Sequence, residues 1–387
     1  LLINALAAVG TLFATHLVAL RLFDSMKVAN IAVALFGVFS FMPEFAVAFW
    51  PHMVSILSVT LAFYFFLRAL DEAPAFLWAI ASGLALGGGL LFRLDGVLLL
   101  STIALVTALY AQKPLMVFAG GAFGLMPGFA LMAWINSVKF GTFNPISYGH
   151  TAGAAVDPTK YAGFAAVAGL VTLVIWAVRV RGGVPRVPGI TPRLVAFLVV
   201  LGLVVAVVFV PQVERLVMRV AKGFYALMID SRAIEDTRPG VRRGAENTWF
   251  FGGMMKKALG QSLPWLGVLA ALVVLPTAQQ RRSIMIVLIF AVLWSLPFIL
   301  RSWHGGLGSN MRYFMPMLPV LSALSAWVIA ALLERIDNPA RPVLAGVLLG
   351  FGAMYAWLML RASGVAGVQQ VLSTYVLFAV VVLVCAG

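Results

Sequence analysis

Long runs of apolar residues, separated by short polar or Pro/Gly-containing breaks, fill most of this 387-residue chain. A helix needs about 20 predominantly apolar residues to cross the hydrocarbon core of a bilayer. Most runs approach that length, whereas a transmembrane β-barrel would show short segments of alternating polarity. The pattern therefore predicts an all-α fold, a polytopic transmembrane helical bundle of about 13 spans, with an interfacial helix in a long external loop.

The ends of the apolar runs define the expected spans. They lie near 1–20, 28–48, 53–70, 75–92, 95–111, 114–135, 161–179, 193–210, 262–278, 283–300, 315–333, 342–360 and 370–387. Residues 1–387 are thus expected to form a single transmembrane domain, and residues 211–262 an external amphipathic loop. Early in that loop, apolar residues recur at helical spacing opposite Arg215, Arg219 and Lys222, which is typical of a helix lying in the membrane interface.

Three of the spans carry small residues at four-residue spacing. These are Gly83 and Gly87, then Gly120, Gly124 and Gly128, and then Gly346 and Gly350. In lipid, such rows let helix backbones approach closely. We expect tight packing within one protein rather than a dimer motif.

Composition excludes a water-soluble protein. The chain is 63% hydrophobic and only 10% charged, whereas a typical soluble chain carries about 25% charged residues. The net charge of +14 does not indicate a nucleic-acid partner, because most Lys and Arg lie at the ends of apolar runs rather than on one soluble face. That placement fits control of topology and contact with anionic membrane lipids. The single cysteine, Cys385, excludes a disulfide framework and a thiolate metal site.

The distribution of Lys and Arg between the short loops predicts which side of the membrane each faces. One set holds twelve of these residues and the other six, and the richer set is expected in the cytoplasm. The richer set lies near 21–27, 68–72, 113, 179–193, 279–282 and 334–341. We therefore expect an integral protein of the bacterial inner membrane, with the opposite loops and their candidate chemistry facing the periplasm.

Two external positions near 41–53 carry candidate chemistry. Glu44 follows Pro43 in an apolar run, where a carboxylate is costly and usually faces a cavity or a partner. The alternative is an interfacial Glu that reaches water. His52, in the turn after Trp50 and Pro51, can donate to a phosphate or a sugar hydroxyl, and is equally consistent with a solvated turn.

Arginines mark two further external segments. Arg93 and Asp95 lie in a tight hairpin between two spans, where Asp95 could orient Arg93 toward a phosphate or simply pair with it at the headgroup level. In the long loop, Arg238, Arg242 and Arg243 surround a Pro-Gly turn. They could clamp a phosphate or bind lipid headgroups.

The segment from Arg301 to Pro319 carries the most specific local pattern. His304 precedes two glycines that permit close ligand approach, and Arg312-Tyr313 stands where the next span begins. A helix N-terminus beside an arginine suits an anion. Among known motifs, no Walker sequence, HExxH or dinucleotide fingerprint is present in the sequence.

Taken together, these motifs resemble the GT-C class of membrane glycosyltransferases, which includes protein O-mannosyltransferases and aminoarabinose transferases. The resemblance spans most of the chain through loose motifs. They are Leu1 to Leu6, Met42-Pro43 to Met53 with Leu61 to Tyr64, Gly83 to Gly87 with Phe92-Arg93, Phe140 to Pro145 with Tyr148 to His150, and Arg312-Tyr313 to Pro319.

The resemblance implies transfer of a sugar from a polyprenyl-phosphate donor at the outer face of the membrane. It implies that Arg93, Arg312 and one of Arg242 or Arg243 bind the donor phosphate, while Glu44, Asp95 and His52 line the sugar or acceptor site. In this class the catalytic base is a carboxylate of the first external loop, and the chain begins after that loop. We therefore expect a fragment, a companion segment that carries the base, or a protein that has lost catalysis. Glu44 and Asp95 are the catalytic candidates within the chain.

Two rival functions remain open on the sequence. One is a transporter or flippase of lipid-linked saccharides, although no matched pair of broken helices recurs. The other is a non-catalytic subunit packed against a membrane-protein partner. No metal ligands are assigned, because the external carboxylates are too scattered to define a site by spacing; a divalent cation stays an open cofactor.

Overall fold

The computed structural model describes residues 2–146, 159–180, 210–235, 240–244, 248–275, 277–305, 308–335 and 366–386, with single positions at 346, 352 and 359. The expected spans near 193–210 and 342–360, the second with Gly350, lie outside these residues, apart from those single positions. Within them the protein is a bundle of helices, so the predicted all-α membrane fold is confirmed.

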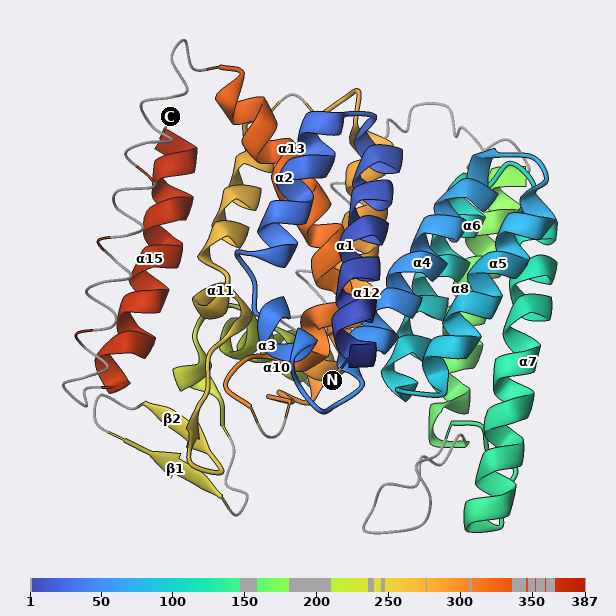
Figure 1. Ribbon diagram of the computed structural model, residues 1–387, viewed down its shortest axis with the longest axis horizontal. Coiled ribbons are helices and arrows are strands. Elements are labelled where there is room, and N and C mark those ends of the chain that lie inside the picture. Colours follow the sequence, from blue (N-terminus) through green and yellow to red (C-terminus); the bar gives the residue numbers. More distant parts are fainter. Residues whose placement is uncertain are drawn as a thin grey trace.

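The helices run up and down across the bundle in Figure 1. Their bounds are α1 Leu2–Phe23, α2 Met26–Gly37, α3 Met42–Ala46, α4 His52–Asp71, α5 Ala75–Leu90, α6 Leu99–Tyr110, α7 Pro114–Phe140, α8 Thr159–Val180, α12 Arg281–Leu300, α13 Leu318–Leu333 and α15 Ala366–Ala386. Among the described residues, five helices are long and apolar enough to cross a membrane, namely α1, α4, α7, α12 and the segment Arg312–Leu333 that contains α13.

One end of the bundle is the predicted external end. The N-terminus of α1, the helix α3 and the small sheet all lie there, at the bottom of Figure 1. α4 starts at this end and α5 finishes at it, so their short connections to α3 and to the following 3-10 helix η1 (Leu94–Leu98) bring external residues together.

The run 28–48 differs from its expectation, because it forms two helices instead of one span. α2 ends at Gly37, and Ser40 then bridges the break by donating to the Phe36 carbonyl and accepting from the Met42 amide at 3.0 Å. Pro43 has no backbone N–H to continue a helix from the preceding turn, and it lies in the first turn of α3, where that N–H is not needed, so a new helix starts here. Glu44 therefore lies in the short helix α3, exposed at the external end, and not within a membrane-crossing helix.

The run 262–278 also differs in form. The short helix α11 (Leu259–Ser262) ends where the run begins, and the run itself contains a ten-residue 3-10 helix, η6 (Pro264–Val273). A 3-10 helix rises about 2.0 Å per residue, so ten residues extend about 20 Å. Gly267 lets η6 approach α15 closely, since a Cβ there would lie 3.2 Å from the Leu377 carbonyl oxygen.

The first two glycine rows hold α5 against α7, as expected from their spacing. A Cβ on Gly124 would lie 2.2 Å from the Ile80 carbonyl oxygen, and one on Gly83 would lie 2.4 Å from the Gly121 carbonyl oxygen. Only residues without a Cβ permit these backbones to touch.

The long external loop folds into small elements at the external end. The helix α10 (Pro211–Phe224) continues into a π-helical turn, η3 (Tyr225–Ile229), and a 3-10 turn, η4 (Ser231–Ala233). A three-stranded antiparallel sheet follows, with order β1 (Val241–Arg243), β2 (Trp249–Phe251), β3 (Met254–Met255). The apolar pattern of the sequence gives no indication of this sheet.

The opposite end of the bundle carries a network of ion pairs. Arg21 contacts Glu72 at 3.1 Å, Arg68 contacts Glu72 at 2.6 Å, and Arg282 contacts Asp71 at 2.8 Å. These pairs join α1, α4 and α12 at the predicted cytoplasmic side.

Candidate functional site

Arg93 forms the centre of a polar cluster at the external end of α5. Its backbone is extended just before η1, which lets its side chain turn back onto Asp95. The guanidinium contacts both Asp95 oxygens, with Nε–Oδ1 at 3.0 Å and Nη2–Oδ2 at 2.9 Å. Both side chains are largely buried. A two-point contact of this kind fixes the plane of the guanidinium as well as its position.

His52, the first residue of α4, joins the cluster through its ring. Arg93 Nη1 lies 2.6 Å from His52 Nδ1. Because a guanidinium only donates hydrogen bonds, Nδ1 is the acceptor and the ring proton is assigned to Nε2. Nε2 is buried and has no hydrogen-bond partner among the described residues. The Nε2–H of His52 is therefore a hydrogen-bond donor without an acceptor among the described residues.

Tyr313 connects Arg93 to Arg312. The Arg93 guanidinium lies 5.1 Å from the centre of the Tyr313 ring, and that of Arg312 lies 5.5 Å from it, both within cation–π range. Arg312 and Tyr313 are the first two residues of the 3-10 helix η7 (Arg312–Met317), which leads directly into α13. Trp294 of α12 donates to the Tyr313 carbonyl at 2.8 Å and so holds η7 in place. The buried Nε of Arg312 has no hydrogen-bond partner in the part of the chain that the structure describes.

Lys256 adds a third cation from the loop between β3 and α11. Its side chain is fully buried, and Nζ donates to the Gly308 carbonyl. Burial, and then the nearby charge of Arg312, lowers the pKa of Lys256 to about 8, although Glu44 acts in the opposite direction. The charges of Arg312 and Glu44 therefore both act on the Lys256 ammonium.

Glu44 reaches the same region from α3. Its Oε2 accepts from Asn310 Nδ2 at 2.7 Å, and Asn310 Oδ1 accepts from Ser262 at 2.9 Å. Asn310 is two residues from Arg312. The cluster of Glu44, His52, Arg93, Asp95, Lys256, Asn310, Arg312 and Tyr313, termed the external cluster below, therefore combines three cations with two carboxylates.

A buried hydrogen-bond network holds the backbone of Lys256. Ser231 donates to the Lys256 carbonyl at 2.8 Å, and Gln370 of α15 donates to the same carbonyl and to Ser231. Gln261 accepts from the Ala258 amide at 2.7 Å and donates to Asp230 at 3.1 Å. Segments far apart in sequence thus set the position of one lysine.

The other sequence candidates lie beside the external cluster or outside the described residues. His304 is buried among aromatic rings, 4.7 Å from Trp249 and 4.6 Å from Phe251. It adjoins the cluster through Trp303, whose ring lies 6.3 Å from that of Tyr313. Arg242 is exposed on β1, Arg243 contacts the carbonyls of Arg232 and Ile234, and Arg238 lies outside the described residues.

Sequence reasoning missed Lys256 and did not assign Asn310 a role. The available signal was the pair Lys256-Lys257 between apolar Met255 and Ala258 in an external loop. Among the described residues, no three His, Cys, Asp or Glu side chains gather closely enough to hold a metal ion.

Comparisons with known proteins give structural neighbours only. No family model and no curated protein matches the chain. One neighbour is the archaeal oligosaccharyltransferase AglB from Archaeoglobus fulgidus in complex with an inhibitory peptide and a dolichol-phosphate. It is 17% identical with a TM-score of 0.49, over 96% of this chain and 44% of that protein.

Another neighbour is the Archaeoglobus fulgidus oligosaccharyltransferase in complex with Zn and sulfate. It is 16% identical with a TM-score of 0.48, over 89% of this chain and 39% of that one. The chain thus spans less than half the length of either neighbour. AglB is of the GT-C class, the class that the sequence motifs resemble.

Proposed function

We propose that this chain is the membrane core of a glycosyltransferase that takes a sugar from a polyprenyl-phosphate donor at the predicted external face. The observation that carries the proposal is the convergence of Arg93, Lys256 and Arg312 at the external ends of membrane helices. A ligand that suits this place has an anionic group at the membrane boundary and a hydrocarbon part in the bilayer. A polyprenyl phosphate has both.

The chemistry of sugar transfer explains why several cations are needed. As the bond from the sugar to the phosphate breaks, negative charge grows on the departing phosphate. Fixed cations in a partly buried site stabilise that charge without reorganising. Arg312 Nε and His52 Nε2 are buried donors without partners among the described residues, and a phosphate bound within the cluster would supply the acceptor that each lacks.

The two carboxylates have different roles in this proposal. Both Asp95 oxygens accept from Arg93, so Asp95 orients that arginine. Glu44 uses Oε2 for Asn310 and is exposed, so its other oxygen can meet an acceptor hydroxyl. Glu44 is therefore the better candidate for a base within this chain.

Binding of a polyprenyl phosphate without a sugar tests the phosphate site directly. We expect the purified protein in nanodiscs to bind the polyprenyl phosphate and not the matching polyprenol. Arg312→Gln and Arg93→Lys should weaken binding about tenfold or more, since each removes directed charge-assisted hydrogen bonds. The matched control is Arg68→Lys, which alters an arginine–carboxylate pair at the opposite end of the bundle. Equal binding of polyprenol and polyprenyl phosphate would refute the site.

Turnover distinguishes transfer from transport. In liposomes containing radiolabelled polyprenyl-phosphate sugars, a transferase releases free polyprenyl phosphate and labels an acceptor without moving the donor between leaflets. Movement of the donor without labelled product would favour a flippase instead.

A further inference from the structure

The helix α10 has two exposed faces of opposite character. Val213, Leu216, Val217, Val220 and Phe224 form an apolar stripe at helical spacing, and the cationic residues Arg215, Arg219 and Lys222 lie across the helix from it. Leu216 and Phe224 are about half exposed, at 52% and 49%. Within the described chain, little protein covers either face.

Contact with α12 sets the depth of α10 in the membrane. Twenty residues of α12 extend about 30 Å, the thickness of the hydrocarbon core, so its last turn lies near the headgroup boundary. Gly223 touches that turn, because a Cβ there would lie 2.0 Å from the Ile299 carbonyl oxygen. Lys222, the preceding residue, is therefore at the level of the lipid headgroups.

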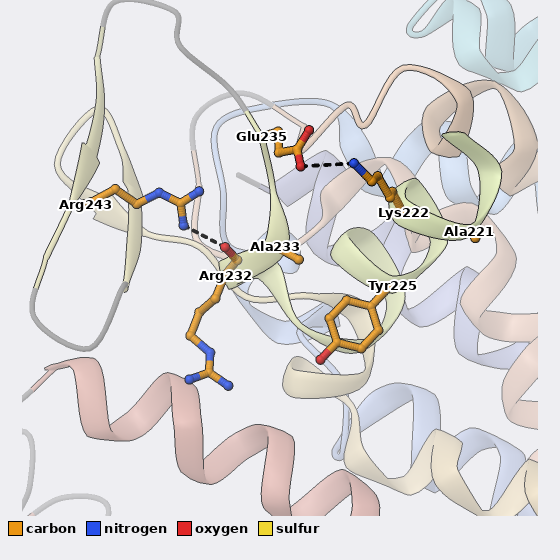
Figure 2. A pocket seen from close by; sticks show the side chains of 7 residues that line it. All are labelled: Ala221, Lys222, Tyr225, Arg232, Ala233, Glu235 and Arg243. Carbon is orange, nitrogen blue, oxygen red and sulfur yellow. Dashed lines mark hydrogen bonds and ion pairs between the residues drawn. The ribbon is translucent and has the colours of Figure 1, made fainter. Parts of the chain in front are cut away.

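An open pocket of about 520 Å³ lies beside this end of α10 and is shown in Figure 2. It is lined by Ala221, Lys222, Tyr225, Arg232, Ala233, Glu235 and Arg243. Three of these side chains are cationic and one is anionic, so the lining has a net positive charge. None of them belongs to the external cluster.

The pocket's side chains are held by contacts that leave it accessible. Lys222 pairs with Glu235 at 3.5 Å, and both remain mostly exposed. Arg243 donates to the Arg232 carbonyl at 2.6 Å and the Ile234 carbonyl at 2.7 Å. Figure 2 shows Lys222 and Arg243 approaching the pocket from different elements. Asp230 holds Arg232 through its side-chain hydrogen bonds, which raise the pKa of Arg232 and keep it charged.

We propose that this pocket binds the phosphate headgroup of an anionic phospholipid, at a depth set by α10, whose apolar stripe lies across the helix from Lys222 and enters the acyl region of the membrane. Charge complementarity favours the anionic headgroup. Because the stripe anchors α10 in the membrane interface, the pocket lies among lipid headgroups, which favours a lipid over a free anion. The inference does not depend on the proposed sugar transfer.

Native mass spectrometry of the purified full chain tests this inference with phosphatidylglycerol and phosphatidylcholine of the same acyl chains. We expect clear preference for phosphatidylglycerol, lowered about fivefold by Lys222→Gln and further by Lys222→Gln with Arg243→Gln. Lys222 is exposed, so its single substitution should not disturb folding. The matched control is Arg242→Gln, the neighbouring arginine of β1 that does not line the pocket, and it should retain the preference.

Three outcomes would overturn the inference. Equal retention of both lipids would show that charge plays no part. Equal loss in Arg242→Gln would show general surface attraction. Displacement of phosphatidylglycerol from the wild-type protein by inorganic phosphate at equal concentration would show a free-anion site and not a lipid site.

Discussion

The hydrogen bond between Arg93 and His52 fixes side-chain geometry at the centre of the external cluster. Arg93 is itself held by Asp95, so three side chains from two helix ends form one chain of contacts. The result is an imidazole whose uncommitted N–H is buried. Sequence reasoning could assign each residue a candidate role, but their mutual contact depends on how α4 and α5 meet.

Glu44 should act on the rate of transfer rather than on donor binding. Glu44→Gln keeps a side chain of the same size and removes the base, so we expect kcat to fall roughly 100-fold or more. Affinity for the polyprenyl phosphate should change little. Steady-state kinetics of the full-length protein measure both. An unchanged kcat would assign the base to a residue other than Glu44.

Lys256 should make donor binding depend on pH. Its pKa of about 8 means that it is charged at pH 7 and mostly neutral at pH 9. We expect affinity for the polyprenyl phosphate to fall about tenfold as pH rises across this range, since one charged contact is lost. Lys256→Gln should bind weakly at both values and show no such step.

The contribution of Lys256 to the stability of the fold should rise with pH as Lys256 loses its proton, whereas donor affinity falls. The pKa in the folded protein lies below the ordinary lysine value of 10.5, so the unfolded chain binds more protons between about pH 8 and that value. The free energy of unfolding attributable to Lys256 therefore rises over this interval. Comparing the thermal unfolding of the wild type with that of Lys256→Gln across this pH range would isolate the contribution of Lys256 to stability. A fall in this contribution would contradict the assignment.

At the scale of elements, apolar run length located the helices well and their internal breaks poorly. α4 and α12 lie close to their expected runs, because hydrophobic length alone determines a simple crossing. The interruption between α2 and α3 depends on Ser40 and Pro43, and the sheet β1–β3 depends on pairing within a loop. A hydropathy pattern does not show such local hydrogen bonds and strand pairings.

The contact of α5 with α7 should be sensitive to a single methyl group. Gly124→Ala would place a Cβ against the Ile80 carbonyl, so we expect a loss of about 1–3 kcal/mol in stability. Gly121→Ala, one turn away on the same helix, meets nothing within 4 Å and should be nearly neutral. Thermal unfolding in detergent measures the difference. Equal unfolding temperatures for the two variants would show that the close approach of α5 and α7 at Gly124 does not contribute to stability.

At the scale of the whole molecule, the two ends of the bundle hold their charged side chains through different contacts. At the predicted cytoplasmic end, Arg21, Arg68 and Arg282 each contact a carboxylate at the C-terminal end of α4, either Asp71 or Glu72. At the other end, Arg93 pairs with Asp95, Lys256 donates to the Gly308 carbonyl, and the buried Nε of Arg312 has no hydrogen-bond partner among the described residues. Loop charge in the sequence indicated the sides, but Lys256 was missed because its burial arises from β3, α11 and α15 meeting in space.

Gln370 should influence the external cluster from a distant part of the chain. Gln370→Leu removes the donors to Ser231 and to the Lys256 carbonyl. We expect a stability loss of about 1–3 kcal/mol and weaker binding of the polyprenyl phosphate, because buried acceptors lose their partner. The control is Ser373→Ala on the same helix, whose hydroxyl donates to the Gln369 carbonyl of α15. Unaltered binding in Gln370→Leu would show that Lys256 is positioned without α15.

This link between α15 and Lys256 has a consequence for biogenesis. Gln370 lies more than a hundred positions after Lys256 along the chain, so the ribosome makes Lys256 well before the residue that anchors it. Until α15 enters the bilayer, Ser231 and the Lys256 carbonyl lack their contacts with Gln370. A nascent chain arrested before α15 would therefore hold its donor-binding surface unfinished, and competence to bind would be acquired late, as translation and insertion reach that helix.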